Sequence, residues 1–250
     1  MFLRLLSLGL MTAGLLRAES HLESYTETHA LDPHGQIRID DTNGAISIRT
    51  WARPEVSLQV EKRASSEDRL KEIQVEVESD PKSLSIRTIF PHHFLGWFWN
   101  IGDAGSVRLV LSVPESVDLN RVSMVNGAIT IEGVHGSIDA HAVNGSVKAT
   151  GLGDDADLST VNGSIHAEAA APGAGGHLHF STVNGSIAVL LGKGANATFS
   201  ASTINGGTSC ALPIRLTEES HRHGMHGVIG TGGASIEAST VNGSVRLEAL

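Results

Sequence analysis

The heptapeptide Ser-Thr-Val-Asn-Gly-Ser-Ile stands complete at Ser159 to Ile165 and again at Ser181 to Ile187. It returns with small changes at Ser202 to Gly206 and at Ser239 to Val245. A phrase that recurs at a nearly fixed period is typical of stacked repeat units, in which no single unit buries its apolar face alone. This phrase therefore decides the fold class more strongly than any other stretch of the chain.

Asn-Gly pairs set the period of the repeat. The sequence holds seven of them, the first at Asn43, and from Asn126 onward the steps between them are 18, 18, 22, 21 and 37 residues. Asn and Gly both tolerate positive φ, so each pair predicts a tight turn or a corner. The six later turns are predicted at Asn126 and Gly127, Asn144 and Gly145, Asn162 and Gly163, Asn184 and Gly185, Asn205 and Gly206, and Asn242 and Gly243.

The residues around each pair read as strands. After Gly163 the apolar Ile165 and Ala167 alternate with polar residues, which is the period of a half-buried strand. Before the pair, apolar positions step by three, as from Leu158 to Val161. A step of three predicts a kink at the Ser-Thr dipeptide that turns Val161 inward.

Two architectures fit this pattern. One is a β-solenoid with one coil of 18 to 22 residues per repeat, in which equivalent corners lie above one another. The other is an antiparallel β-meander or sandwich, because Asn-Gly between alternating strands is also the strongest short-range signal of a hairpin. The complete phrase returns only at 18 residues or more. The sequence therefore predicts an all-β fold and favours the solenoid.

The chain divides into three parts. Residues 1–18 combine Arg4, an apolar run and Ala18, which is the layout of a cleaved secretory signal peptide. Residues 19–114 predict a β-rich region of short strands, with one short helix capped by Ser65 or Ser66. Residues 115–250 form the Asn-Gly repeat domain. No clear linker separates the last two parts, so we expect them to share a continuous core.

Composition excludes several classes of protein. The 250 residues carry 18 Lys and Arg against 27 Asp and Glu, a formal net charge of −9, which argues against nucleic-acid binding. The single Cys210 rules out a disulfide framework and a cysteine-based zinc site. No motif for a cofactor is present, and no transmembrane span is expected once the signal peptide is removed.

One segment is unusually aromatic. Half of the ten aromatic residues lie within residues 90–99, between two predicted strands, and these are Phe90, Phe94, Trp97, Phe98 and Trp99. Aromatic loops of this kind anchor protein interfaces or sit at membrane surfaces. The same loop could instead fold over an open end of the solenoid and cap its core. The sequence leaves both roles open.

Other polar clusters have simpler explanations. His221, His223 and His226 are weak candidates for a metal site, because a Gly-rich loop more often holds solvated histidines. Asp154, Asp155 and Asp157 resemble the carboxylate clusters of some hydrolases, but they fall at a repeat corner. The sequence therefore predicts neither a metal centre nor a catalytic residue.

The repeated (Ser/Thr)-(Val/Ile)-Asn-Gly-(Ser/Ala)-(Ile/Val) phrase behind a signal peptide resembles the bacterial DUF4097 family of adhesin-like β-repeat proteins. The closing stretch from Gly227 to Val245 resembles the last repeat of that family, and the resemblance covers about residues 107–250. It implies a β-rich envelope or surface protein and brings no established catalytic residues.

These observations lead to three functional hypotheses. The first is an exported, non-enzymatic cell-envelope protein, an adhesin-like module that binds an envelope protein, a glycan or a second copy of itself. It would reside in the periplasm or at the cell surface. The second is a structural periplasmic scaffold linked to envelope stress. The third, ranked last, is a polysaccharide-active β-helix enzyme that uses the Asp154 to Asp157 patch.

Overall fold

The computed structural model describes residues 21–90, 105–217 and 223–250. Within these ranges it has nineteen strands, linked by their pairings into one sheet, and one short helix, α1 (Glu67–Glu72). The prediction of an all-β fold is confirmed. The hydroxyl of Ser66 caps α1 by accepting a hydrogen bond from the backbone N–H of Arg69, at 3.3 Å.

Seven strands precede or begin the repeats. They are β1 (His21–Ala30), β2 (Gln36–Trp51), β3 (Glu55–Ala64), β4 (Gln74–Asp80), β5 (Ser83–Ile89), β6 (Ser106–Pro114) and β7 (Asp118–Glu132). Each predicted strand of the N-terminal half has a counterpart among them. The short strands that the sequence predicts at Gln36 to Asp40 and at Ala45 to Trp51 are joined into the single long strand β2.

The repeats supply twelve shorter strands. They are β8 (Ile138–Asn144), β9 (Val147–Thr150), β10 (Asp155–Asn162), β11 (Ile165–Ala169), β12 (His177–Asn184), β13 (Ile187–Leu191), β14 (Ala197–Asn205), β15 (Thr208–Cys210), β16 (Ile214–Leu216), β17 (Gly224–Ile229), β18 (Ala234–Asn242) and β19 (Val245–Ala249). In most repeats a longer strand ends at the Asn of an Asn-Gly pair, and a shorter strand begins three residues later.

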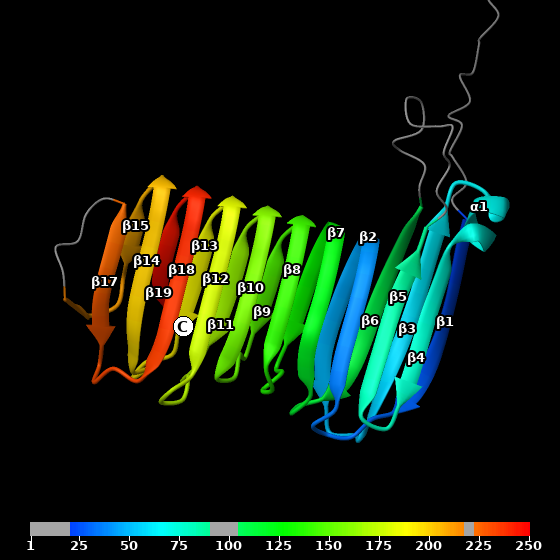
Figure 1. The fold of residues 1–250 in the computed structure, drawn as a ribbon, viewed down its shortest axis with the longest axis horizontal. Coiled ribbons are helices and arrows are strands. Elements are labelled where there is room, and N and C mark those ends of the chain that lie inside the picture. The colour runs from blue at the N-terminus through cyan, green and yellow to red at the C-terminus, as the bar shows by residue number, and fades with distance from the viewer. Residues whose placement is uncertain (1–20, 91–104, 218–222) are drawn as a thin grey trace, which may run out of the picture.

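The strands form two layers, one behind the other in Figure 1. Within each layer, the strands follow one another along the long axis of the molecule. The long strands β2 and β7 pass from one layer to the other, because their first and second halves pair with different neighbours. One layer continues from β7 through β8, β10, β12, β18 and β14, and the other through β9, β11, β13, β19 and β15.

Strands one repeat apart pair in parallel and in register, so that Ser159 of β10 lies opposite Ser181 of β12. Equivalent residues of successive repeats therefore lie above one another. Antiparallel pairing is confined to the two ends of the molecule. It joins β1, β3 and β6, and also β4 and β5, at one end, and β14, β17 and β16 at the other.

The order of the repeats in space differs from their order in the chain. The last repeat, β18 and β19, lies between the repeat of β12 and β13 and the repeat of β14 and β15, as Figure 1 shows. The far edge of β14 is covered by antiparallel β17. The final coil is thus held between two coils that precede it in sequence.

A single hydrophobic core runs between the layers and crosses residue 114 without a break. It is rich in Ile and Leu around β2, whereas alanines such as Ala140, Ala149 and Ala167 fill much of the middle repeats. Phe180 and Phe199 are its largest fully buried side chains. No helix in the described ranges is long and apolar enough to cross a membrane.

Candidate functional site

The Asn-Gly pairs build one continuous edge of the molecule, where the chain passes from one layer to the other. We call it the corner edge. Each Asn after Asn43 donates its Nδ2 to the Oδ1 of the Asn in the adjacent repeat, at 2.7 to 2.9 Å. The ladder runs in the order Asn43, Asn126, Asn144, Asn162, Asn184, Asn242 and Asn205.

Glycine follows each Asn because the stacked coils leave no space for a side chain. A Cβ built on Gly163 would lie 2.0 Å from the carbonyl oxygen of Gly145, and the other later pairs give 1.7 to 2.0 Å. Of the seven pairs, only Gly44 and Gly127 have φ in the left-handed region, and no Asn does. The expectation that positive φ selects Asn-Gly is therefore right for two glycines, and close stacking explains the others.

The threonine of the repeated phrase is buried and donates a hydrogen bond to the corner of a neighbouring repeat. The hydroxyl of Thr160 donates to the carbonyl oxygen of Gly145 at 2.8 Å, and Thr182, Thr203 and Thr240 make equivalent bonds. These side chains are only 4 to 5% exposed. A buried hydroxyl is tolerated here because the neighbouring coil satisfies it.

The residue before the Asn is exposed in five of the seven pairs, which corrects the prediction that Val161 turns inward. Burial alternates through the Ser-Thr dipeptide and breaks one step later, so that Val161 and Asn162 are both exposed. The result is a row of apolar side chains beside the Asn ladder. Its exposed fractions are 38% for Val125, 41% for Val143, 41% for Val161, 40% for Val183 and 67% for Ile204.

The aromatic segment follows β5 and precedes β6 in the chain. Asp40 of β2 pairs with Arg87 of β5, and Gly44 pairs with Val107 of β6, so these two flanking strands pair with β2 on either side of its corner. Phe90 is half-buried and packs against the core. The other four predicted binding residues, Phe94, Trp97, Phe98 and Trp99, lie outside the described residues.

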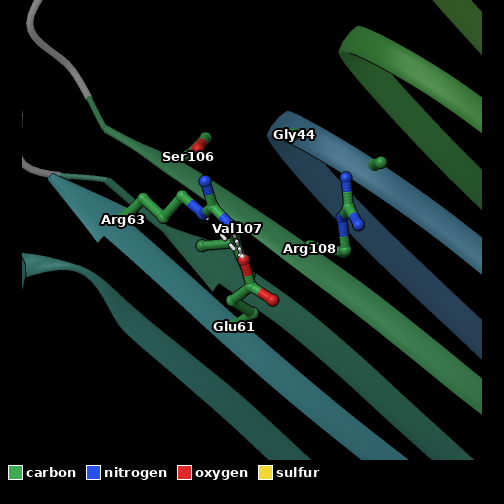
Figure 2. A pocket seen from close by; sticks show the side chains of 7 residues that line it. Gly44, Glu61, Arg63, Ser106, Val107 and Arg108 are labelled. Atoms are coloured by element: carbon green, nitrogen blue, oxygen red, sulfur yellow. Dashed lines mark hydrogen bonds and ion pairs between the residues drawn. The ribbon is translucent and has the colours of Figure 1, made fainter. Parts of the chain in front are cut away.

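A hollow of about 320 Å³ opens beside the first corner. Its lining comes from β2, β3 and β6, and includes Gly44, Arg63 and Arg108 (Figure 2). Arg63 is paired with Glu61, whose Oε1 lies 2.7 Å from Nε and 2.5 Å from the Nη2 atom of Arg63. Sequence reasoning did not single out this site, since no local motif brings the three strands together.

Asp41 is a buried carboxylate at the first corner. It is 3% exposed and occupies the inward level that Met124, Ala142 and Thr160 hold in successive coils. Its Oδ1 accepts hydrogen bonds from the hydroxyl of Thr88 and the backbone N–H of Thr42, whereas Oδ2 has no hydrogen-bond partner in the described residues. Burial raises the pKa of Asp41 to about 6, against the lowering effect of these bonds.

Asp139, His141 and Ser159 form a chain of polar contacts on the outer face of β8 and β10. His141 contacts the carboxylate of Asp139 through Nε2 and the hydroxyl of Ser159 through Nδ1. An aspartate, a histidine and a serine in contact are the residue types of a hydrolase triad. Such a triad needs, in addition, preorganised N–H donors that stabilise an oxyanion. Both strands lie between paired neighbours, so the ladders use their backbone N–H groups, and the side chains of Asp139 and His141 are 43% exposed. The geometry favours a surface polar contact.

The acidic patch of Asp154 to Asp157 and the described histidines His223 and His226 belong to different parts of the fold, at β10 and β17 respectively. Asp154 and Asp155 each accept a backbone N–H of the next coil, from Gly173 at 2.7 Å and from His177 at 3.1 Å. They therefore stabilise the stacking of turns. His223 and His226 are exposed near and on β17, and His221 lies outside the described residues. In the part of the chain that the structure describes, no three potential ligands are grouped to hold a metal.

No protein-family model matches the chain, and no curated protein matches it. Among solved structures, a provisionally named cell adhesion protein from Clostridium sporogenes is 11% identical over 91% of this chain and 100% of its own, with a TM-score of 0.52. A provisionally named adhesin from Bacteroides fragilis is 16% identical over 91% and 97%, with a TM-score of 0.35. The first likeness shows a shared fold, and the second adds no further support.

Proposed function

We propose that this chain is an exported, non-enzymatic cell-envelope protein that acts as an adhesin-like binding module of the DUF4097 type. Its repeat region would be a β-solenoid of 18- to 22-residue coils, which the parallel, in-register ladders support. The Clostridium protein that shares the fold is named for cell adhesion, which supports a binding role. The chain would act in the periplasm or at the cell surface.

The corner edge is the observation that carries this proposal. Five apolar side chains remain 38 to 67% exposed beside the Asn ladder, and four of them, Val125, Val143, Val161 and Val183, stand before consecutive members of the ladder. Contiguous exposed apolar rows mark binding surfaces more often than chance exposure does. An amide has two N–H groups and two acceptor positions, and an inner ladder Asn uses one of each. Each rung thus offers a ligand an apolar contact, a donor and an acceptor.

The aromatic segment would extend this surface. The segment follows β5 and precedes β6, which pair with β2 on either side of the first corner, and we propose Phe94, Trp97, Phe98 and Trp99 as further binding residues. Aromatic anchors of this kind dominate the energy of many interfaces. An envelope protein, a glycan or a second copy would each match such a surface, whereas the net charge of −9 argues against nucleic acid.

Co-sedimentation of the mature protein with isolated bacterial cell envelopes tests the proposal. A Trp97→Ala, Phe98→Ala, Trp99→Ala variant and a Val143→Ser, Val161→Ser, Val183→Ser variant should each be retained at least tenfold less. Val228→Ser, on β17 and away from the corner edge, is the matched control and should be retained like the parent protein.

Two other outcomes would decide against it. Equal retention of all variants would place binding elsewhere or remove it. If the aromatic variant lost its β-type circular dichroism, the segment would be a cap of the core, and the structural scaffold would become the better explanation.

A further inference from the structure

Two arginines, Arg63 and Arg108, line the hollow beside the first corner. In the sheet, Arg108 of β6 lies between Ala45 of β2 and Glu61 of β3. Glu61 is already engaged by Arg63, and Arg108 forms no ion pair within the described ranges. Figure 2 shows Ser106 and both arginine side chains around the hollow. A short Ala45 and the missing side chain of Gly44 leave the space open.

We propose that this hollow binds the anionic group of an acidic polysaccharide, a carboxylate, sulfate or phosphate on its sugars, while the polymer continues along the corner edge. The inference rests on the proposed binding function and names its ligand class. Arginine presents a planar fork of N–H donors that matches the oxygens of these groups in pairs. Arg108 would make the main contact, with the hydroxyl of Ser106 beside it.

The sign of the charge supports this ligand class. Two arginines and one glutamate line the hollow, in a chain whose net charge is −9. The two arginines outweigh the glutamate, and a concave surface with a net local charge concentrates ligands of the opposite sign, even when the whole protein repels them. Arg63 is partly neutralised by Glu61, so its contribution would be smaller than that of Arg108.

The position of the hollow supports a polymer over a free ion. Gly44 belongs to the first Asn-Gly corner, so the hollow opens at one end of the Asn ladder. Along that edge, the unused amide donors and acceptors match sugar hydroxyl groups, and the valine row matches their C–H faces. A hollow of about 320 Å³ is at the small end of ligand sites, which suits one charged sugar unit.

Isothermal titration calorimetry tests the proposal with four probes: polygalacturonate oligosaccharides, heparin oligosaccharides, neutral cello-oligosaccharides and inorganic phosphate. We expect one or both charged oligosaccharides to bind, with an affinity that falls as salt is added. Arg108→Gln should weaken that binding at least tenfold, and Arg63→Gln a few-fold. Glu61→Gln should strengthen it a few-fold, because Arg63 is then released.

Arg246→Gln, an exposed arginine of β19 at the other end of the same layer, is the matched control and should bind like the parent protein. Unchanged binding by Arg108→Gln would overturn the proposal, as would equal binding of the neutral oligosaccharide. Phosphate binding as tightly as the oligosaccharides would also overturn it, in favour of a simple ion site. Envelope retention that survives Arg108→Gln would leave the proposed function standing and remove this ligand class alone.

Discussion

The middle repeats and the N-terminal end solve the same packing problem in different ways. In the coils from β8 to β13, the same polar side chains recur at the same level, and each is satisfied by its copy in the next coil. Around β1 to β6 the pairing is partly antiparallel, the core is rich in Ile and Leu, and the short helix α1 packs against β1 and β3.

The difference teaches what a stacked fold loses where its repeated partner stops. Inside the ladder, every inner Asn donates one hydrogen bond to a neighbouring Asn and accepts one from another. The ladder ends at the first corner. There Asp41 occupies the inward level that Thr160 holds in a later repeat, and its Oδ2 has no hydrogen-bond partner among the described residues. The hollow with Arg108 opens beside the same corner.

The sharpest way to break the regular half is to add a methyl group to its glycine stack. Gly163→Ala should lower the free energy of unfolding by about 3 kcal/mol or more, because its Cβ would lie 2.0 Å from the Gly145 carbonyl oxygen and the coils must separate. Chemical denaturation measures the change. Gly207→Ala has nothing within 4 Å of its Cβ and should stay within about 0.5 kcal/mol. Equal effects at both sites would show that stacking does not select glycine.

Asp41 tests the irregular half. Its pKa of about 6 in the folded state lies above the ordinary 3.8. Between these two pH values the folded state therefore keeps a proton that the unfolded state has lost. The free energy of unfolding is then largest below about pH 4. It falls by about 3 kcal/mol as the pH rises toward 6, because the pKa is shifted by nearly two units. Asp41→Asn should therefore be more stable than the parent by about 2 kcal/mol at pH 7.5 and little different at pH 4. Urea midpoints at the two pH values check this, and a constant difference would contradict it.

Position in the ladder should matter for asparagine. Asn162 makes two ladder bonds and Asn205, at the end, makes one. Asn162→Ala should cost about 1 to 2 kcal/mol of unfolding free energy and Asn205→Ala about half as much, since exposed amide bonds contribute modestly. Thermal or urea unfolding of the two variants measures the ratio. An equal cost would mean that the ladder gives no added support to its interior members.

The smallest effect is expected on the apolar row. Val161→Ser should change stability by less than about 0.5 kcal/mol, because the side chain is 41% exposed and packs little against the core. The same substitution contributes to the loss of envelope retention proposed above. A large loss of stability would show that the valine row serves folding, and would remove the main support for a binding edge.

Local pattern in the sequence was enough to predict a good deal of this protein. Alternation along β3, β5 and β6 and the helix cap at Ser66 depend on neighbouring residues, so they could be predicted. Asn43 belongs to the first of the seven Asn-Gly pairs, and it begins the ladder by accepting a hydrogen bond from Nδ2 of Asn126 at 2.8 Å. The direction of Val161 was predicted wrongly, because the partner that lets Thr160 be buried is a carbonyl in another coil.

By itself, the sequence determined the all-β fold, the period of the repeat and the residues at its corners, because alternation and Asn-Gly pairs act over a few positions. Only the tertiary structure decided the order of the coils. Asn242 carries the same phrase as its neighbours and could stack on any of them, yet it lies between Asn184 and Asn205. The hollow likewise depends on the strand register that sets Arg108 of β6 opposite Glu61 of β3, residues far apart in the chain. Contacts of that range leave no local pattern to read.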